Sequence, residues 1–211
     1  MKLTKYTHAC FVLEKEGSSL VVDPGNWSSD FVVPTSVAAV VITHEHPDHF
    51  DIEKLRRIIA QNPNAIIVAH ADITAQVTDL PTRSVNVGER ISVGPFDLEF
   101  FGGQHAVIHS SYPIVANLGV MIDDRLYYPG DSFALPDKPV DTLLLPISAP
   151  WLKVGEALDF VSRVNPQHCI PTHDAILSDA GKTLLDRMTT AYAETAGSTY
   201  QRLDGQSIVL E

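Results

Sequence analysis

The chain has 211 residues, of which 45% are hydrophobic and 19% are charged, a composition typical of a folded globular protein. Its formal net charge is -11, so its surface would on average repel a nucleic acid. The basic stretch EKLRR at residues 53–57 does not alter this expectation, because Glu53 and Arg57 are four apart on a predicted helix and would pair with each other. We expect a single domain over residues 1–211 and no nucleic-acid partner.

No segment has the length and apolarity of a membrane span, and the N-terminal residues lack the apolar core of a signal peptide. We therefore expect a cytoplasmic protein without a membrane partner. Cys10 and Cys169 are too few for a disulfide framework, and both lie in apolar runs that indicate buried thiols. A ligand role for Cys169, four residues before His173, is the alternative. No heptad pattern indicates an oligomeric state.

The first half of the chain reads as strands joined by short turns. HACFVLE and SLVVD flank the turn KEGS and predict a hairpin, and the β-branched runs AAVVIT and AIIVA predict two more strands. Between those two runs, Asp51 is a helix N-cap and Asn62-Pro63-Asn64 ends the helix. A second, short helix is predicted over residues 73–80.

Strands return after Arg83, in RSVNV, RISV, FDLEFFGG, VANLGVMID and RLYYPGD. DTLLLPI and HCIPTHD enclose a helix whose apolar stripe includes Val154, Ala157 and Val161. A last helix carries Leu184, Leu185 and Met188 at helical spacing, and SIVL predicts a final strand. Two strand-rich halves, each followed by helices, predict an α/β fold in which two sheets pack face to face with helices outside, a four-layer αβ/βα sandwich.

Three of the nine histidines fall within six residues, in HEHPDH at residues 44–49. In an extended segment, side chains two apart point the same way, so His44 and His46 are placed to bind one cation. Asp48 and His49 follow Pro47 and a turn, and are placed to face a neighbouring position. Imidazole and carboxylate together favour zinc and also accept manganese or iron.

Further ligands are expected where later strands end, because an α/β sheet carries its chemistry in the loops beyond the strand termini. His105, Asp131 and His173 each follow an apolar run in this way. His70 and His168 lie outside the motifs that are compared with a known family below, and are interpreted as core or surface histidines. A histidine-rich surface turn with three unrelated residues is the alternative interpretation of the whole set.

The motifs THEHPDH, GGQH, YPGDS and PTHD, preceded by VVDPG, resemble in content and order those of the metallo-β-lactamase superfamily. This resemblance implies the metallo-β-lactamase fold, with His44, His46 and His105 on one metal ion, Asp48, His49 and His173 on a second, and Asp131 bridging them. It also implies that Asp23 orients a metal ligand, although an ordinary turn at the end of a strand explains Asp23-Pro24-Gly25 as well. The cofactor is expected to be two divalent ions, zinc first, with Mn²⁺ or Fe²⁺ as alternatives.

Departures from the known branches narrow the function. Asp131 stands where many zinc β-lactamases have a cysteine, and both histidines of His44-Glu45-His46 are present, unlike in the flavin-coupled di-iron relatives. The remaining resemblance is to the small metal-dependent hydrolases that include the ascorbate phosphate lactonase. It implies a hydrolase in which a metal-bridging hydroxide cleaves an ester, lactone or phosphoester of a small, anionic substrate. Asp48 would then also assist proton transfer.

The substrate itself is not encoded in these motifs. Candidate substrate contacts are His8 in THACFVLE, His109 and Tyr112 in the loop after His105, and Trp27 and Trp151, although loop packing explains each of them as well. Two alternative functions stand beside the small-molecule hydrolase: a binding or regulatory module that kept the fold without catalysis, and a nuclease-type phosphodiesterase.

Overall fold

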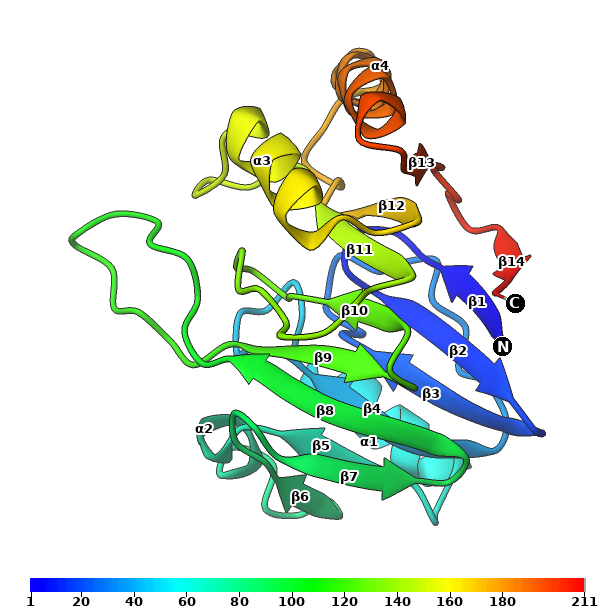
Figure 1. Ribbon diagram of the computed structural model, residues 1–211. Coiled ribbons are helices and arrows are strands. Elements are labelled where there is room, and N and C mark those ends of the chain that lie inside the picture. The colour runs from blue at the N-terminus through cyan, green and yellow to red at the C-terminus, as the bar shows by residue number, and fades with distance from the viewer. Residues whose placement is uncertain (211) are drawn as a thin grey trace.

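The strands of this chain form two mixed sheets that pack face to face in the computed structural model, which describes residues 1–210 (Figure 1). The first sheet has the order β14-β1-β2-β3-β4-β5-β6. Its strands are β1 (Lys2–Lys5), β2 (Phe11–Lys15), β3 (Ser18–Val22), β4 (Val37–Ile42), β5 (Ile66–Ala69), β6 (Thr82–Ser84) and β14 (Ser207–Val209). The C-terminal strand thus completes the sheet that the N-terminus begins.

The second sheet has the order β13-β12-β11-β10-β9-β8-β7. Its strands are β7 (Arg90–Val93), β8 (Phe96–Gly102), β9 (Leu118–Ile122), β10 (Leu126–Tyr128), β11 (Thr142–Pro146), β12 (His168–Thr172) and β13 (Thr199–Tyr200). Strands β9 to β12 are buried along most of their length, which explains why their sequences are apolar runs rather than alternating patterns.

Alternation along β2 shows how the layers are held together. Phe11 and Leu13 point into the core between the two sheets, whereas Val12 points to the outer face of the first sheet and packs with residues of helix α1 (Ile52–Gln61). A third apolar cluster joins the outer face of the second sheet to helix α3 (Val154–Val164). The predicted four-layer αβ/βα arrangement is confirmed.

The helices begin largely where the sequence predicts. Asp51 caps α1 by accepting hydrogen bonds from the backbone N–H groups of Glu53 and Lys54, at 3.0 and 3.1 Å. Helix α4 (Asp179–Thr195) begins after Ser178, which accepts from Gly181 N. None of the helices in residues 1–210 is long and apolar enough to cross a membrane.

Three elements differ from the prediction. The short helix predicted over residues 73–80 is instead the single turn α2 (Ala71–Thr74), which His70 caps by accepting from Asp72 N. His70 sets where this helix begins, and after Thr74 the chain continues in turns rather than in a helix, with Gln76 N donating to Ile73 O at 2.9 Å and Leu80 N to Val77 O at 3.0 Å. Strands β1 and β13 were not predicted, because they are short and have little β-forming pattern of their own; both are specified by their neighbours in the sheets.

The ends of β4 and the start of β9 lie against each other across the two sheets. Leu118 N donates to Thr43 O at 2.9 Å, so the segment that follows β4 is tied to the second sheet. Gly130, which follows β10, packs against the same place: a Cβ on Gly130 would lie 2.9 Å from Thr43 Cβ and 2.4 Å from Asn117 Oδ1. This close approach sets the histidine motif of the first sheet beside Asp131 of the second.

Candidate metal centre

All seven predicted ligands meet at one edge of the sandwich. Three overlapping groups have ligand atoms within 4.8 Å of one another: His44, His46 and His105; His44, His49 and Asp131; and His8, Asp48, His49 and His173. The seven predicted ligands follow β4, β8, β10 and β12, so both sheets contribute ligands. His8 is the one member of these groups that was predicted in another role.

A tight turn folds HEHPDH back on itself. The backbone N–H groups of His49 and Phe50 both donate to His46 O, at 3.0 and 2.9 Å, which brings Asp48 and His49 round to the second group. Gly25 packs directly against this turn. A Cβ built on Gly25 would lie 1.9 Å from Asp48 O and 2.3 Å from His49 N, so a residue without a side chain is required there. The VVDPG motif therefore supplies space as well as a carboxylate.

The histidine rings are held through Nδ1. His44 Nδ1 lies 3.1 Å from Thr43 Oγ1, His105 Nδ1 lies 2.6 Å from the carbonyl oxygen of Ala106, and His173 Nδ1 lies 2.6 Å from the carbonyl oxygen of Ser148. A carbonyl oxygen only accepts, so His105 and His173 donate through Nδ1. Their Nε2 lone pairs then face the centre, which is the tautomer that a metal ligand requires.

Asp23 anchors the middle of the site from behind. Its Oδ2 lies 2.7 Å from His49 Nδ1 and accepts from Thr43 Oγ1 at 2.6 Å, while its Oδ1 accepts from Thr43 N at 2.8 Å. Asp23 is fully buried and has a left-handed backbone with φ of 45°. The structure thus places Asp23 where a residue that orients a ligand would stand, and it also makes a turn after β3.

Unsatisfied polar atoms mark the centre of the cluster. Within residues 1–210, Nε2 of His44, His49, His105 and His173 and Oδ1 of Asp131 are buried without a hydrogen-bond partner. His49 Nε2 and Asp131 Oδ1 are 3.2 Å apart but are not aligned for a hydrogen bond. Buried polar atoms are rarely left unpaired in proteins, since each costs about 1–3 kcal/mol. A nitrogen-rich set with carboxylates therefore fits divalent transition metals, zinc among them.

The pKa shifts within the cluster also favour the binding of metal ions. Burial, together with neighbouring histidines, lowers the pKa of His44 and of His46, so both rings are neutral and available as ligands. Burial also disfavours the charged form of Asp131, but His49 and His173 outweigh it and hold its pKa well below the usual range. Against burial, Asp131 raises the pKa of His173 to about 9. Cations binding here would displace that proton.

His8 is fully buried behind Asp48 rather than exposed to a substrate. Its Nδ1 accepts from Ala175 N at 3.3 Å, which leaves the proton of the neutral ring on Nε2, 2.9 Å from Asp48 Oδ2. Burial lowers the pKa of His8 to about 4, so the ring is neutral. His8 O also accepts from His173 N at 3.1 Å. His8 therefore contacts both Asp48 and the segment that carries His173.

The two tryptophans occupy different positions. Trp151 is half-buried, and its Nε1 donates to Asp131 Oδ2 at 2.9 Å, so this candidate substrate contact holds a predicted ligand in place. Trp27 is 43% exposed and meets the His8 ring edge to face, with centroids 4.8 Å apart. Trp27 therefore lies beside the site with free surface, as a substrate contact would.

The two candidates in the loop after His105 also differ. His109 is bonded within its own loop, with Nδ1 2.8 Å from Ser111 Oγ and 3.1 Å from Ser111 N. Tyr112 is 62% exposed and lines a cavity that His46 also lines. Cys169 is buried inside β12, and among the described residues it belongs to none of the candidate ligand groups. Burial raises its pKa to about 12, as expected of a core thiol.

Sequence patterns missed several residues that shape the site. Thr43 links Asp23 to His44, and Gly25 makes room for the ligand turn. Both residues lie within the quoted motifs, so their position in the sequence close to predicted ligands could have indicated a role in the site. The carbonyl oxygen of Ser148 and the N–H of Ala175 are backbone groups, and no side-chain pattern identifies such groups.

Comparison with known proteins agrees with this picture. The family model described as "Beta-lactamase superfamily domain" matches residues 2–173. "Protein Rv0786c" of Mycobacterium tuberculosis is 35% identical over 215 residues, covering 99% of both chains. A "UPF0173 metal-dependent hydrolase" of Aeropyrum pernix is 31% identical over 202 residues, covering 82% of this chain and 81% of its own.

Among solved structures, Igni18, a metallo hydrolase from Ignicoccus hospitalis, superposes with a TM-score of 0.76 and covers 100% of this chain and 99% of its own. Its sequence is 21% identical, so this likeness concerns the fold. The family match includes every strand except β13 and β14, and it includes the predicted ligand motifs from Asp23 to His173. The chain belongs to the metallo-β-lactamase superfamily, the family that its motifs predict.

Proposed function

We propose that this protein is a metal-dependent hydrolase that binds two divalent cations, with zinc as the expected metal. It cleaves an ester, lactone or phosphoester bond of a small molecule. The observation that carries the proposal is the set of buried, unpaired ligand atoms at the centre of the cluster. Relatives named as metal-dependent hydrolases support the reaction class. The ascorbate phosphate lactonase type stays the predicted branch, since it rests on the sequence resemblance alone.

In this proposal the donor set forms two metal positions on either side of Asp131. His44, His46 and His105 would hold one ion; Asp48, His49 and His173 would hold the other, with Asp131 between them. Such ions supply a water molecule acidic enough to serve as a nucleophile near neutral pH, and positive charge opposite a developing oxyanion. Ser and Cys nucleophiles are then not needed, in agreement with the burial of both cysteines.

The side chains of the chain have separate tasks in this reaction. Asp48 is half-buried beside the cluster and accepts from His8, so one of its oxygens is fixed while the carboxylate remains placed to receive and pass on a proton. Trp151 fixes Asp131 through Oδ2. Asp23 and the backbone carbonyls behind His105 and His173 keep the rings in one tautomer, so that they need not reorganise when substrate binds.

Activity and metal content should be lost together. We expect His46→Ala and Asp131→Ala to lower the bound metal below that of the unaltered chain and to reduce kcat/KM for generic lactone, ester or phosphodiester probes by about a thousandfold or more. His168→Ala is the matched control, because His168 is exposed and bonded to Thr199 Oγ1 away from the cluster. Metal content would be measured by plasma mass spectrometry.

Two results would argue against the proposal. A protein that binds its full complement of metal and hydrolyses none of the probe classes would favour a binding or regulatory module. Cleavage of phosphodiesters alone, and of polynucleotides better than of small esters, would favour the nuclease-type alternative, which the net charge of -11 disfavours.

A further inference from the structure

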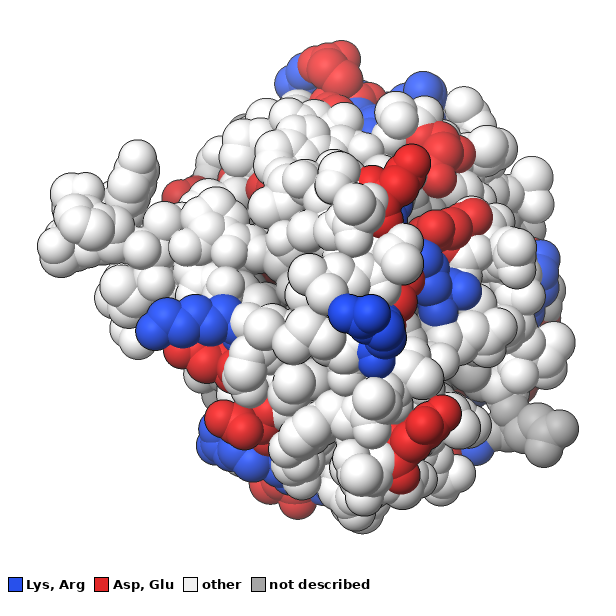
Figure 2. Space-filling model, turned by 90° about the horizontal axis from the view of Figure 1, so that it is seen from above, with Lys and Arg blue, Asp and Glu red and all other residues white. Residues whose placement is uncertain are grey.

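The loop between β8 and β9 projects from the body of the protein as an arm, here defined as residues 106–116 (Figure 1). Its base is fixed: His105 N donates to Val115 O at 3.0 Å, and Ala106 N donates to Asp131 O at 2.8 Å. The arm therefore begins and ends beside two predicted metal ligands. Its sequence contains no charged residue, and Figure 2 shows an uncharged projection from this side of the molecule.

A cavity of about 400 Å³ lies between the arm and the metal cluster. One wall consists of Glu45, His46 and Gln76, and the other of arm residues that include Ile108, Tyr112 and Val115. This volume falls within the range of about 300–1,000 Å³ that small-molecule sites occupy. Because His46 belongs to both the cavity and the ligand cluster, a molecule bound at the metal centre would have this cavity beside it.

The arm presents more apolar surface than packing within the chain requires. Tyr112 is 62% exposed, Val107 60% and Ile114 51%, while Ile108 and Val115 are half-buried on the side of the cavity. Three large apolar side chains are thus exposed within eleven residues, and exposed apolar surface of this kind can mark a binding site when it lies beside a cavity. Of the arm residues, Ile108, Tyr112 and Val115 line the cavity and offer apolar contact to a molecule that enters it.

The charge in the cavity has one sign. Glu45 supplies a carboxylate, whose Oε2 accepts from Gln76 Nε2 at 2.8 Å, and no lysine or arginine stands among the described lining residues. A carboxylate or phosphate placed in this cavity would be repelled by Glu45 and would find no cation to pair with. An uncharged alkyl or aryl group would instead bury apolar area against the arm.

We propose that this cavity binds an uncharged, apolar part of the substrate, so that the substrate carries its reacting group at the metal centre and an apolar tail between Tyr112 and Gln76. The inference rests on the proposed hydrolase function and narrows the small, anionic substrate expected from the sequence: any anionic charge lies in the reacting group and not in the tail. Esters, lactones and phosphoesters with alkyl or aryl tails are the class that fits.

Three hydroxamates distinguish the contribution of the tail to the binding affinity from that of the metal-binding group. Acetohydroxamate has the metal-binding group and no tail, hexanohydroxamate adds an alkyl tail, and the monohydroxamate of adipic acid ends that tail in a carboxylate. We expect zinc-loaded protein to bind hexanohydroxamate about tenfold or more tightly than acetohydroxamate, since each buried CH₂ contributes up to about 0.8 kcal/mol. The carboxylate should remove most of that gain. Calorimetric titration gives the three affinities.

Variants of the lining identify the cavity as the cause. Tyr112→Ala should cancel the gain from the alkyl tail, and Glu45→Gln should improve the affinity for the adipic compound, relative to that for acetohydroxamate, about threefold or more. Leu184→Ala is the control, since Leu184 is 47% exposed on α4. Methyl NMR signals of Ile108 and Val115 should shift with the hexanoyl compound and not with acetohydroxamate.

The outcomes distinguish the two proposals. Tight binding of acetohydroxamate without any gain from the alkyl tail, or equal binding of the alkyl and carboxylate tails, would overturn the cavity inference and leave the hydrolase standing. A gain that persists in Tyr112→Ala without arm shifts would place the tail elsewhere and also overturn it. Failure of all three compounds to bind metal-loaded protein would overturn both.

Discussion

At the scale of single residues, His8 links the second predicted metal position, through Asp48 and the His173 backbone, to the segment that precedes β2. It is buried, its Nε2 lies 2.9 Å from Asp48 Oδ2, and its backbone is left-handed with φ of 67°. Strained backbone that is retained beside a site commonly serves that site. We infer that His8 positions Asp48 rather than touching the substrate, the role first predicted for it.

His8→Ala should therefore weaken metal binding at one position more than at the other. Residues that orient a metal ligand typically contribute about 10–100-fold to affinity or activity. We expect a chelator to remove one of the two cobalt ions from cobalt-loaded His8→Ala before the other. The titration should then show two separate losses of cobalt absorption. His8→Gln, which offers a similarly placed N–H donor, should restore much of the second ion. An unchanged titration in His8→Ala would show that the contact does not position Asp48.

Gly25 gives a second test at this scale. Because a Cβ there would lie 1.9 Å from Asp48 O, Gly25→Ala must displace the turn that carries Asp48 and His49. We expect loss of metal and of kcat/KM by about a hundredfold or more, with the protein still folded by circular dichroism. Gly155→Ala is the control, since that glycine lies in α3 with open space around its Cα. Normal metal content in Gly25→Ala would contradict the packing described.

The residue types at the site were predictable, but their supporting contacts were not. His44, His46, His105, Asp131 and His173 follow apolar strands in recognisable motifs, because ligands must stand where strands end. That His8 accepts from Ala175, or that Trp151 donates to Asp131, depends on loops separated by many residues. No local periodicity encodes such contacts, so the sequence left His8 and Trp151 as general candidates.

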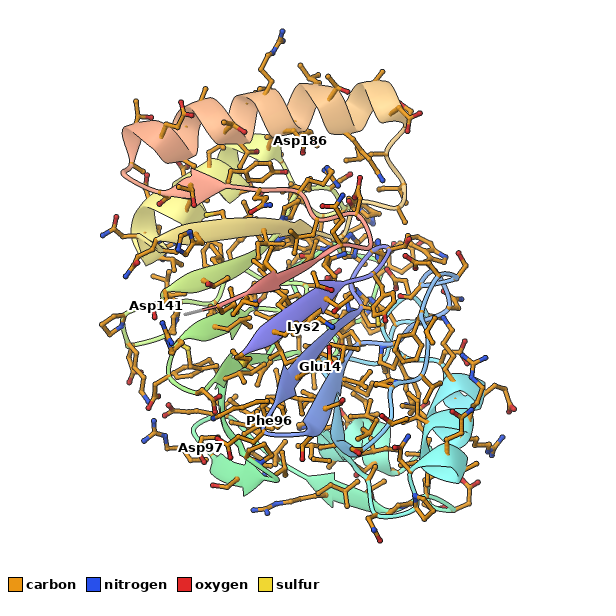
Figure 3. All side chains as sticks on the ribbon, turned by 90° about the vertical axis from the view of Figure 1, so that its right-hand side faces the viewer. Lys2, Glu14, Phe96, Asp97, Asp141 and Asp186 are labelled. Atoms are coloured by element: carbon orange, nitrogen blue, oxygen red, sulfur yellow. The ribbon has the colours of Figure 1, made fainter. Side chains whose placement is uncertain are left out.

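At the scale of elements, the segment between β13 and β14 is tied to α4 and to the end of β12 by one arginine. Arg202 contacts Asp186 of α4 with Nε and Nη2, both at 2.7 Å, and pairs with Asp174, the residue after His173. Figure 3 shows Asp186 on the side of α4 that faces the sheet. This network supports the His173 segment through its neighbour.

Asp186 should make the stability of this element depend on pH. Burial disfavours its charge, but Arg202 and Tyr200 outweigh that effect and lower its pKa. A carboxylate with a lowered folded pKa stabilises the protein above its unfolded pKa of about 3.9, and that stability is lost as pH falls through the folded pKa.

Asp186→Asn should cost about 1–2 kcal/mol of unfolding free energy at pH 7, after allowance for solvent screening, and less at pH 3, which lies below the unfolded pKa. Urea unfolding of the metal-free protein at both pH values measures this difference without a contribution from metal release. An equal cost at pH 3 and pH 7 would mean that packing rather than charge is lost.

The sequence specified most elements and missed those that rely on neighbours. Amphipathic α1, with its Asp51 cap, and apolar β4 and β11 have strong local signals. Strand β13 has two residues and pairs with β12 at the sheet edge, whereas β1 (Lys2–Lys5) mixes lysines with Leu3 and is a strand because β2 and β14 pair with it on both sides. The prediction of a second helix over residues 73–80 was wrong, because the chain forms only the single turn α2, which His70 caps.

At the scale of the whole molecule, the site exists because two sheets meet at one edge. The first sheet supplies His44 to His49, the second supplies His105, Asp131 and His173, and Leu118 N to Thr43 O joins the two at 2.9 Å. Metal bound between the sheets would hold both halves together. Fold class and family followed from element order and motifs, whereas the projecting arm did not, since no pattern in residues 106–116 indicates its direction.

Removal of metal should therefore destabilise the entire fold. A ligand present at about a thousand times its Kd stabilises the folded state by about 4 kcal/mol. For a protein of this size, that corresponds to a fall in Tm of at least about 8 °C on treatment with a chelator. Differential scanning calorimetry with and without chelator measures it, and Asp131→Ala should show little change. A Tm that does not respond to metal would place the bound ions outside the core of the fold.

Anomalous X-ray scattering at the metal absorption edge, from crystals of metal-loaded protein, tests the central claim most directly. The account predicts two peaks, one among His44, His46 and His105 and one among Asp48, His49 and His173, with Asp131 between them. A single peak, peaks away from these residues, or none at saturating metal would contradict the two-metal centre.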